Sequence, residues 1–127
     1  MEKLNFDSGV QTFRVGGGVL RFNPSDPNLY ARFLEAADKL TALERELTEQ
    51  APGGDAIALL QEADRRVKDL LRQVFGGDND LDAVFAGVNL LAVGGNGERV
   101  LTNFLAALEP VLTRGARACA KAEAGRL

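Results

Sequence analysis

The sequence contains no histidine and no tryptophan, and it has a single cysteine, Cys119. Histidine is the commonest general base and the commonest metal ligand, so its absence argues against catalysis and against a transition-metal site. One cysteine cannot form an internal disulfide, and we interpret Cys119 as a small apolar residue of a helix in a reducing compartment. These absences favour a protein that is not an enzyme and that holds no metal or cofactor.

Long apolar runs and an excess of positive charge are also missing. No stretch approaches the ~20 apolar residues of a membrane-spanning helix, and the opening MEKLNFDSG lacks the basic and then apolar layout of a secretory signal peptide. The formal net charge is -3, unlike that of the strongly basic domains that bind nucleic acids. We therefore expect a cytoplasmic protein with neither a membrane nor a nucleic acid among its partners.

What is present suffices for one domain, because 46% of the 127 residues are hydrophobic. Near the start of the chain apolar residues alternate on a period of two, which predicts three short strands at residues 4–6, 13–15 and 20–22. The stretches DSG and GGG between them suit tight hairpin loops, since glycine accepts positive φ. We predict a three-stranded antiparallel β meander.

In the middle of the chain the apolar spacing changes to three and four, which predicts two amphipathic helices. Ser25 or Asp26 can cap a first helix that runs from Pro27 to Gln50, where APGGD breaks the pattern. Asp55 can cap a second helix, which should end at Gly76. Because the helices are of similar length and their connector is short, we expect an antiparallel helical hairpin.

The apolar stripes of these helices leave two alternatives open. They either face each other as a seam inside the chain or offer a groove to the helix of a partner. The residues concerned are Leu40, Leu43, Leu47, Leu60, Val67 and Leu71. Acidic and basic residues four apart, such as Asp64 and Lys68, are predicted to lie on the outer, solvated face. Tyr30 is expected to pack against the sheet.

The last third of the chain is predicted to contain a short helix at 81–85, a buried apolar segment at 88–93 and a final helix from Val100. Pro110 lies inside the pattern of this final helix. It lacks a backbone donor and crowds the preceding turn, so we expect a kink or a break just before it. The tail from Arg114 is predicted to be solvated.

The stretch AVGGNGERV (92–100) resembles a phosphate-binding loop but lacks the residues that such loops need. A dinucleotide fingerprint requires glycine or alanine where Val100 stands, and a P-loop requires a lysine and a hydroxyl residue where Glu98 and Arg99 stand. We interpret the stretch as a turn in which Asn96 caps the final helix.

The stretch DNDLD (78–82) matches the first three ligands of an EF-hand calcium loop. The loop also needs glycine and glutamate at the positions where this chain has Ala83 and Asn89. We interpret Asp80 as the cap of the short helix. The sequence therefore predicts no catalytic, cofactor-binding or metal-binding residue.

Three stretches nevertheless resemble a known family: FNPSDPNLYARF, VFGGDNDLDAVFAGVN and NGERVLTNFLAALEP. They are similar to small tail-assembly-chaperone-like proteins encoded among the tail genes of siphophages and prophages of Gram-positive hosts, and the similarity covers nearly the whole chain. The resemblance implies a non-enzymatic, self-associating protein of the bacterial host cytoplasm that engages the tape-measure protein or tail-tube subunits. It transfers no functional residues.

The expected fold class is α+β, mostly helical, with the β meander packed on the long helical hairpin plus C-terminal helices. The expected single domain, 1–127, has three parts, at 1–24, 25–76 and 77–127. The expected function is that of a phage tail-assembly chaperone or accessory protein and homo-oligomer, which binds tape-measure or tail-tube proteins. The alternative is a structural virion protein, such as a tail-tube or completion subunit.

Overall fold

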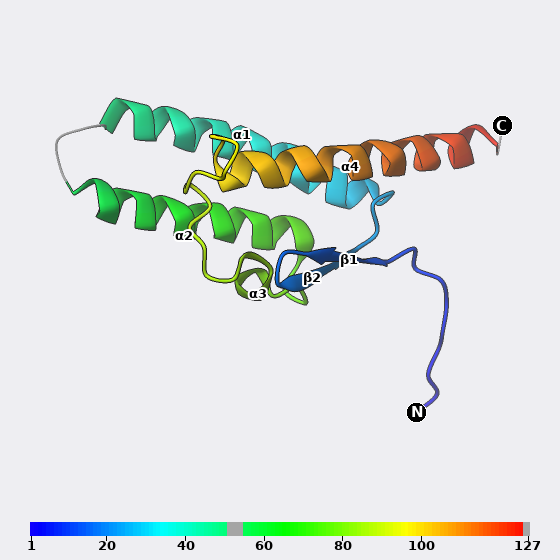
Figure 1. Cartoon of the computed structure of the whole chain (residues 1–127). Helices are drawn as coiled ribbons and strands as arrows, with labels where there is room; N and C mark the ends of the chain where they lie inside the picture. The colour runs from blue at the N-terminus through cyan, green and yellow to red at the C-terminus, as the bar shows by residue number, and fades with distance from the viewer. Residues whose placement is uncertain (51–54, 126–127) are drawn as a thin grey trace.

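The computed structural model describes residues 1–50 and 55–125 and shows a mostly helical α+β fold (Figure 1). Its elements in chain order are β1 (Gln11–Val15), β2 (Gly18–Phe22), α1 (Pro27–Gln50), α2 (Ala56–Phe75), α3 (Leu81–Phe85) and α4 (Val100–Ala124). α1 and α2 run antiparallel, α4 contacts α1, and the small sheet packs with α3 near the C-terminal end of α2. The predicted fold class is confirmed at this level.

The sheet is a two-stranded antiparallel hairpin. Val15 pairs with Gly18, so Gly16 and Gly17 alone make the turn, and Gly16 has a φ of 54°. A Cβ at Gly18 would lie 2.8 Å from the backbone nitrogen of Val84, which is too close for any larger residue. Glycine therefore allows the start of β2 to rest directly on the backbone of α3.

The predicted three-stranded meander is not confirmed, because Leu4 and Phe6 belong to no strand and are 83% and 82% exposed. Strand register supplies a physical reason. A hairpin with DSG as its three-residue loop would set Phe6 opposite Val10 and Leu4 opposite Thr12. Directly opposite residues share one face of a sheet, so both apolar side chains would join Thr12 on the exposed face. Little apolar surface would be buried by that pairing.

The helical hairpin has the bounds and most of the caps that the sequence predicts. Asp26 accepts a hydrogen bond from the backbone N–H of Asn28 at 2.9 Å, and Asp55 accepts one from Ile57 at 3.1 Å. Gly76, with a φ of 89°, ends α2. The predicted connector at residues 51–54 lies outside the described residues.

The facing stripes of α1 and α2 form a seam inside the chain. Leu40 and Leu43 from α1, together with Val67 and Leu71 from α2, are buried in one hydrophobic core. The alternative in which these faces form an open groove is therefore wrong for this structure. Leu47 and Leu60, at the ends of the two stripes, are only partly buried against this core.

The predicted short helix is confirmed as α3, but the apolar segment after it is buried only in its middle. Leu90 and Leu91 are 0% and 5% exposed, whereas Val88 and Val93 are 43% and 66% exposed. The prediction that the whole segment is buried was thus wrong at both ends. The segment crosses the surface and inserts only two side chains into the core.

Helix α4 is continuous from Val100 to Ala124, so the predicted break before Pro110 is wrong. The tail from Arg114 lies in this helix, and most of its residues are exposed, as predicted. The carbonyl of Ala106 loses its amide partner at Pro110, but both residues are exposed, so water can bond to that carbonyl. Gly115 is buried, and a Cβ there would overlap the carbonyl of Pro24. This contact fixes α4 beside the link from β2 to α1.

Aromatic rings join the sheet to the helices. Phe13 stacks on Phe22 with 4.7 Å between ring centroids, and Phe22 lies 5.2 Å from Phe75 of α2. Phe104 of α4 meets the edges of both Phe75 and Phe85. None of the helices within residues 1–50 and 55–125 is long and apolar enough to cross a membrane.

Candidate functional site

The glycine-rich turn at 94–98 uses its own backbone donors. The amide of Gly94 donates to the carbonyl of Glu98 at 2.7 Å, and that of Gly97 donates to Gly94 at 3.0 Å. Asn96 accepts from the amide of Glu98 at 3.1 Å. Donors that are engaged within the turn are not directed at a phosphate, which agrees with the interpretation of this stretch as a turn.

The predicted helix-capping role of Asn96 is wrong. Helix α4 begins one residue after Arg99, which occupies the cap position without a side-chain bond. The side chain of Asn96 instead bonds to that of Asn103 in the first turns of α4, at 2.8 and 3.2 Å. Arg99 donates to the carbonyl of Leu91 at 3.1 Å, so the turn is fastened to the buried segment as well.

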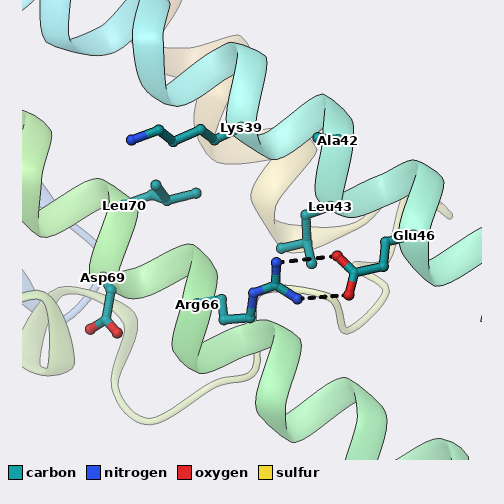
Figure 2. A pocket seen from close by; sticks show the side chains of 7 residues that line it. All are labelled: Lys39, Ala42, Leu43, Glu46, Arg66, Asp69 and Leu70. Carbon is teal, nitrogen blue, oxygen red and sulfur yellow. Dashed lines mark hydrogen bonds and ion pairs between the residues drawn. The ribbon is translucent and has the colours of Figure 1, made fainter.

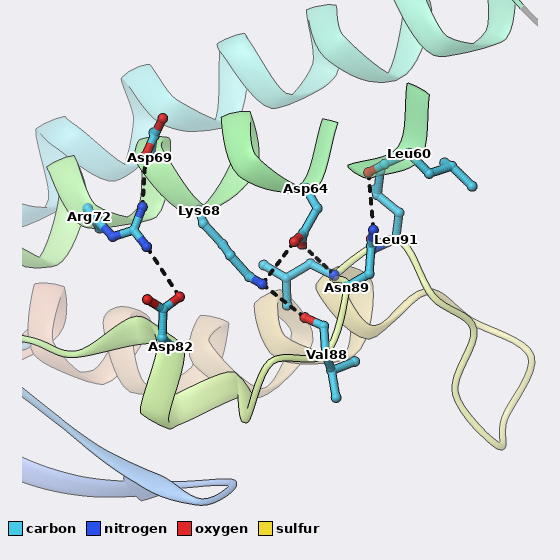
Figure 3. Close-up of polar contacts among 10 residues, drawn as sticks. Leu60, Asp64, Lys68, Asp69, Arg72, Asp82, Val88, Asn89 and Leu91 are labelled. Carbon is cyan, nitrogen blue, oxygen red and sulfur yellow. Dashed lines mark hydrogen bonds and ion pairs between the residues drawn. The ribbon is translucent and has the colours of Figure 1, made fainter. Parts of the chain in front are cut away.

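Two aspartates of the acidic stretch DNDLD are engaged in hydrogen bonds within the protein. Asp80 caps α3 as predicted, accepting from the amide of Ala83 at 3.1 Å. Asp82 receives a hydrogen bond from Arg72 at 3.3 Å, and Arg72 also binds Asp69 at 2.7 Å (Figure 3). No group of three or more metal-ligating side chains occurs within the described parts of the chain.

The polar cluster around Asp64 and Lys68 points inward, so the prediction that this pair lies on the solvated face is wrong. The two side chains are 15% and 10% exposed and form an ion pair of 2.9 Å. Asp64 also accepts the amide of Leu90 at 2.7 Å, and Lys68 also donates to the carbonyl of Val88 at 3.1 Å (Figure 3). Through this ion pair, α2 binds the backbone of the segment at 88–90, which passes over it.

Asn89 completes this attachment from the other side. Its amide nitrogen donates to the carbonyl of Leu60 at 3.1 Å, and its oxygen accepts from the amide of Leu91 at 2.8 Å. Within the described residues no buried side-chain nitrogen or oxygen lacks a hydrogen-bond partner. The cluster is therefore satisfied by the protein itself, and its chemistry is that of a structural fastening.

A hollow of about 350 Å³ lies over the seam of α1 and α2 (Figure 2). Arg66 and Glu46 bridge it with two hydrogen bonds of 3.2 Å. Lys39 and Asp69 add one charge of each sign to the wall. Because opposite charges alternate around an open hollow and the central pair is already bonded, the site favours neither an anionic nor a cationic ligand.

A second hollow, of about 330 Å³, lies between the start of α1 and the end of α4. Tyr30 and Cys119 line it, and Tyr30 is 42% exposed. The prediction that Tyr30 packs against the sheet is thus wrong, since it faces α4. Cys119 is half-buried in α4, in agreement with its interpretation as a small apolar helix residue.

A third hollow, of about 310 Å³, lies between the first turn of α2 and the segment that crosses it. Its lining residues are Ile57, Leu60, Gln61, Asn89, Leu91 and Ala92. Ile57 is 69% exposed, and Val93, next in sequence to the lining residue Ala92, is 66% exposed. We call this feature, with Val93 included, the Ile57 hollow. Concave, exposed apolar surface of this kind suits a protein partner.

No family model, no curated protein and no solved structure matches this chain.

Sequence reasoning missed two features of these surfaces. The inward direction of Asp64 and Lys68 depends on a segment that begins 20 residues later in the chain, so helical spacing alone gave no signal of it. Leu4 and Phe6, which their alternation predicts to lie in a strand, are exposed outside the sheet. Exposed apolar groups gather at the Ile57 hollow and along residues 1–10.

Proposed function

We propose that the protein is a non-enzymatic tail-assembly chaperone or accessory factor of a siphophage, acting in the cytoplasm of the bacterial host. Its partner is the tape-measure protein or a tail-tube subunit, and it acts as an oligomer. The resemblance of its sequence to chaperone-like tail proteins supports this proposal. A gene for a tape-measure protein immediately downstream would support it further.

The Ile57 hollow is the observation that carries the proposal. Its apolar walls and the polar Gln61 and Asn89 reproduce the apolar centre and polar rim of a protein interface. In this proposal the tape-measure protein presents a helix, and an apolar side chain of that helix fills the hollow. Reversible binding there shields an aggregation-prone helical surface until assembly.

The test is co-expression with the tape-measure protein of the same tail gene cluster. We expect the chain to keep the tape-measure protein in solution, and Ile57→Ser combined with Val93→Ser to abolish this effect. Leu34→Ser is the matched control, because Leu34 is 50% exposed on α1, away from the residues that line the hollow. Equal protection by wild type and by the Ile57/Val93 variant would refute the role of the hollow.

A structural virion subunit is the second candidate, and the small sheet favours it, since β1 has a neighbour on one side only among the described residues. Tail tubes can be built by pairing sheet edges. Rings or tubes of the purified chain in electron micrographs would favour this candidate. A discrete small oligomer that captures tape-measure peptide would favour the chaperone.

A further inference from the structure

Residues 1–10 carry apolar side chains that nothing in the described structure covers. Met1, Leu4 and Phe6 are more than 80% exposed, and Val10 is 47% exposed. Leu4 and Phe6 alternate with Lys3, Asn5 and Asp7, which is the pattern of a strand with one apolar face. Figure 1 shows the chain bending before the start of β1 and the segment leading away from the helices. We call residues 3–7 the leading segment.

A turn separates the leading segment from β1, because Gly9 has a φ of 74° and its amide donates to the side chain of Asp7 at 2.9 Å. Asn23, the residue after β2, donates from its side chain to the carbonyl of Ser8 at 2.9 Å. Gly9 lies against the same asparagine, where a Cβ would come 2.5 Å from its amide nitrogen. Gln11 is the first residue that pairs with β2, and the positive φ of Gly9 interrupts strand geometry before it, so the faces of the leading segment are not set by those of β1. The turn carries the leading segment away from its own hairpin, which places its backbone groups to pair with another chain.

One edge of the sheet is already closed. Asn79 is 8% exposed, and its side chain accepts from the amide of Arg21 at 2.7 Å and donates to the carbonyl of Arg21 at 3.1 Å. These two bonds imitate a neighbouring strand, so the outer edge of β2 cannot receive one at this position.

The other edge of the sheet, that of β1, has no neighbouring strand among residues 1–50 and 55–125. Thr12 stands opposite Arg21 in the hairpin, and the backbone groups of Arg21 point away from β1 toward Asn79. In an antiparallel pair, the backbone N–H and C=O groups of two directly opposite residues either both face the partner strand or both face away from it. The groups of Thr12 therefore face away from β2, toward the open edge of β1. Because the direction of these groups repeats every second residue, the backbone groups of Arg14 also face the open edge. Both residues are exposed.

We propose that the leading segment of one copy pairs as an additional strand with the open edge of β1 in a second copy, and that the second copy does the same in return. β1 has five residues, as many as the leading segment. The two reciprocal contacts are identical, so they close a dimer with two-fold symmetry. The proposal deepens the self-association that forms part of the proposed function.

The register of this pairing follows from the apolar faces. An antiparallel arrangement with Phe6 opposite Phe13 and Leu4 opposite Val15 extends the half-buried side of the sheet that covers the core. It also sets Asp7 beside Thr12 and within diagonal reach of Arg14, so a carboxylate meets a guanidinium on the outer face. Pairing within one chain through a DSG hairpin would instead put Leu4 and Phe6 on the exposed face of the sheet. A second copy is therefore the better acceptor.

The test is sedimentation of the purified chain over a wide range of concentration. We expect a monomer–dimer equilibrium, and we expect the double variant Leu4→Ser and Phe6→Ser to weaken the dimer at least about 100-fold, because two apolar side chains are lost from each of two identical contacts. The double variant Ile57→Ser and Val93→Ser is the matched control and should dimerise normally. Both variants change exposed residues, and circular dichroism verifies that each is folded.

Hydrogen exchange and mixing distinguish the occupants of the open edge. Amide protection at Thr12 and at residues 3–7 should rise together with protein concentration. Thr12→Pro removes the outward N–H of the acceptor edge, so this variant alone should be monomeric. Mixed with the Leu4/Phe6 variant, which lacks the donor strand, it should form a heterodimer through one contact.

Three results would overturn the inference: a monomer at every concentration, a dimer indifferent to the Leu4/Phe6 variant, or protection of residues 3–7 that does not depend on concentration. The last would mean that the segment folds onto its own chain. A monomer that still captures the tape-measure protein would refute this dimer but leave the proposed function standing. A dimer of the predicted kind that binds no tail protein would support this inference and refute the proposed function.

Discussion

Replacing Asp64 by alanine should cost far more stability than its place on an amphipathic helix suggests. The carboxylate accepts hydrogen bonds from the Lys68 ammonium at 2.9 Å and from the amide of Leu90 at 2.7 Å. Without it, the buried Lys68 keeps only its hydrogen bond to the carbonyl of Val88. Removing one partner of a buried pair costs about 3–5 kcal/mol, and the slight exposure of this pair places our expectation near ~3 kcal/mol.

Urea denaturation followed by circular dichroism measures this loss as a change in the free energy of unfolding. The double variant Asp64→Ala and Lys68→Met removes both charges, and its cost should fall below the sum of the single costs by about 1–3 kcal/mol. Arg65→Ala is the control, because Arg65 pairs with Glu62 on the surface, where such pairs contribute about 0–1 kcal/mol. Equal, small losses for Asp64→Ala and Arg65→Ala would refute the fastening role of the buried pair.

Other packing and backbone features give further expectations. Gly115→Ala should destabilise the protein by about 1–3 kcal/mol in thermal unfolding, because its Cβ overlaps the Pro24 carbonyl; a gain in stability, as helix propensity alone predicts, would contradict this contact. Asn79→Ala removes hydrogen bonds to backbone groups of Arg21 and Phe75, so we expect a loss of about 3 kcal/mol and faster amide exchange at Arg21. Pro110→Ala should raise the free energy of unfolding by about 1–3 kcal/mol, since the alanine amide restores a helical hydrogen bond; unchanged stability would mean that hydration already compensates.

Features that depend on neighbouring residues in the chain could be predicted from the sequence. Asp55 and Asp80 cap their helices as expected, and Gly76 ends α2, because each of these effects acts within one turn of helix. The seam of the hairpin was one of two stated alternatives. Which of the two arrangements forms depends on how much apolar surface each one buries, and the spacing of apolar residues does not give that area.

Features that depend on distant contacts could not be predicted. Asp64 and Lys68 have the spacing of a surface pair, yet the segment at 88–90 passes over them and turns them into a buried attachment. Pro110 has a local tendency to break a helix, but packing on either side keeps α4 continuous. The Ile57 hollow arises where two separate segments meet, so no single stretch of sequence indicates it.

The side chain of Asn79 has a consequence for how many copies can assemble. A sheet with two open edges can add subunits without limit and grow into a fibre. Here one edge is occupied by an amide of the same chain, so each molecule has a single vacancy for a strand. Once two molecules fill each other's vacancies, none remains for a third. Asn79 thus confines strand addition at this sheet to the edge of β1, and the reciprocal exchange proposed above closes at two copies.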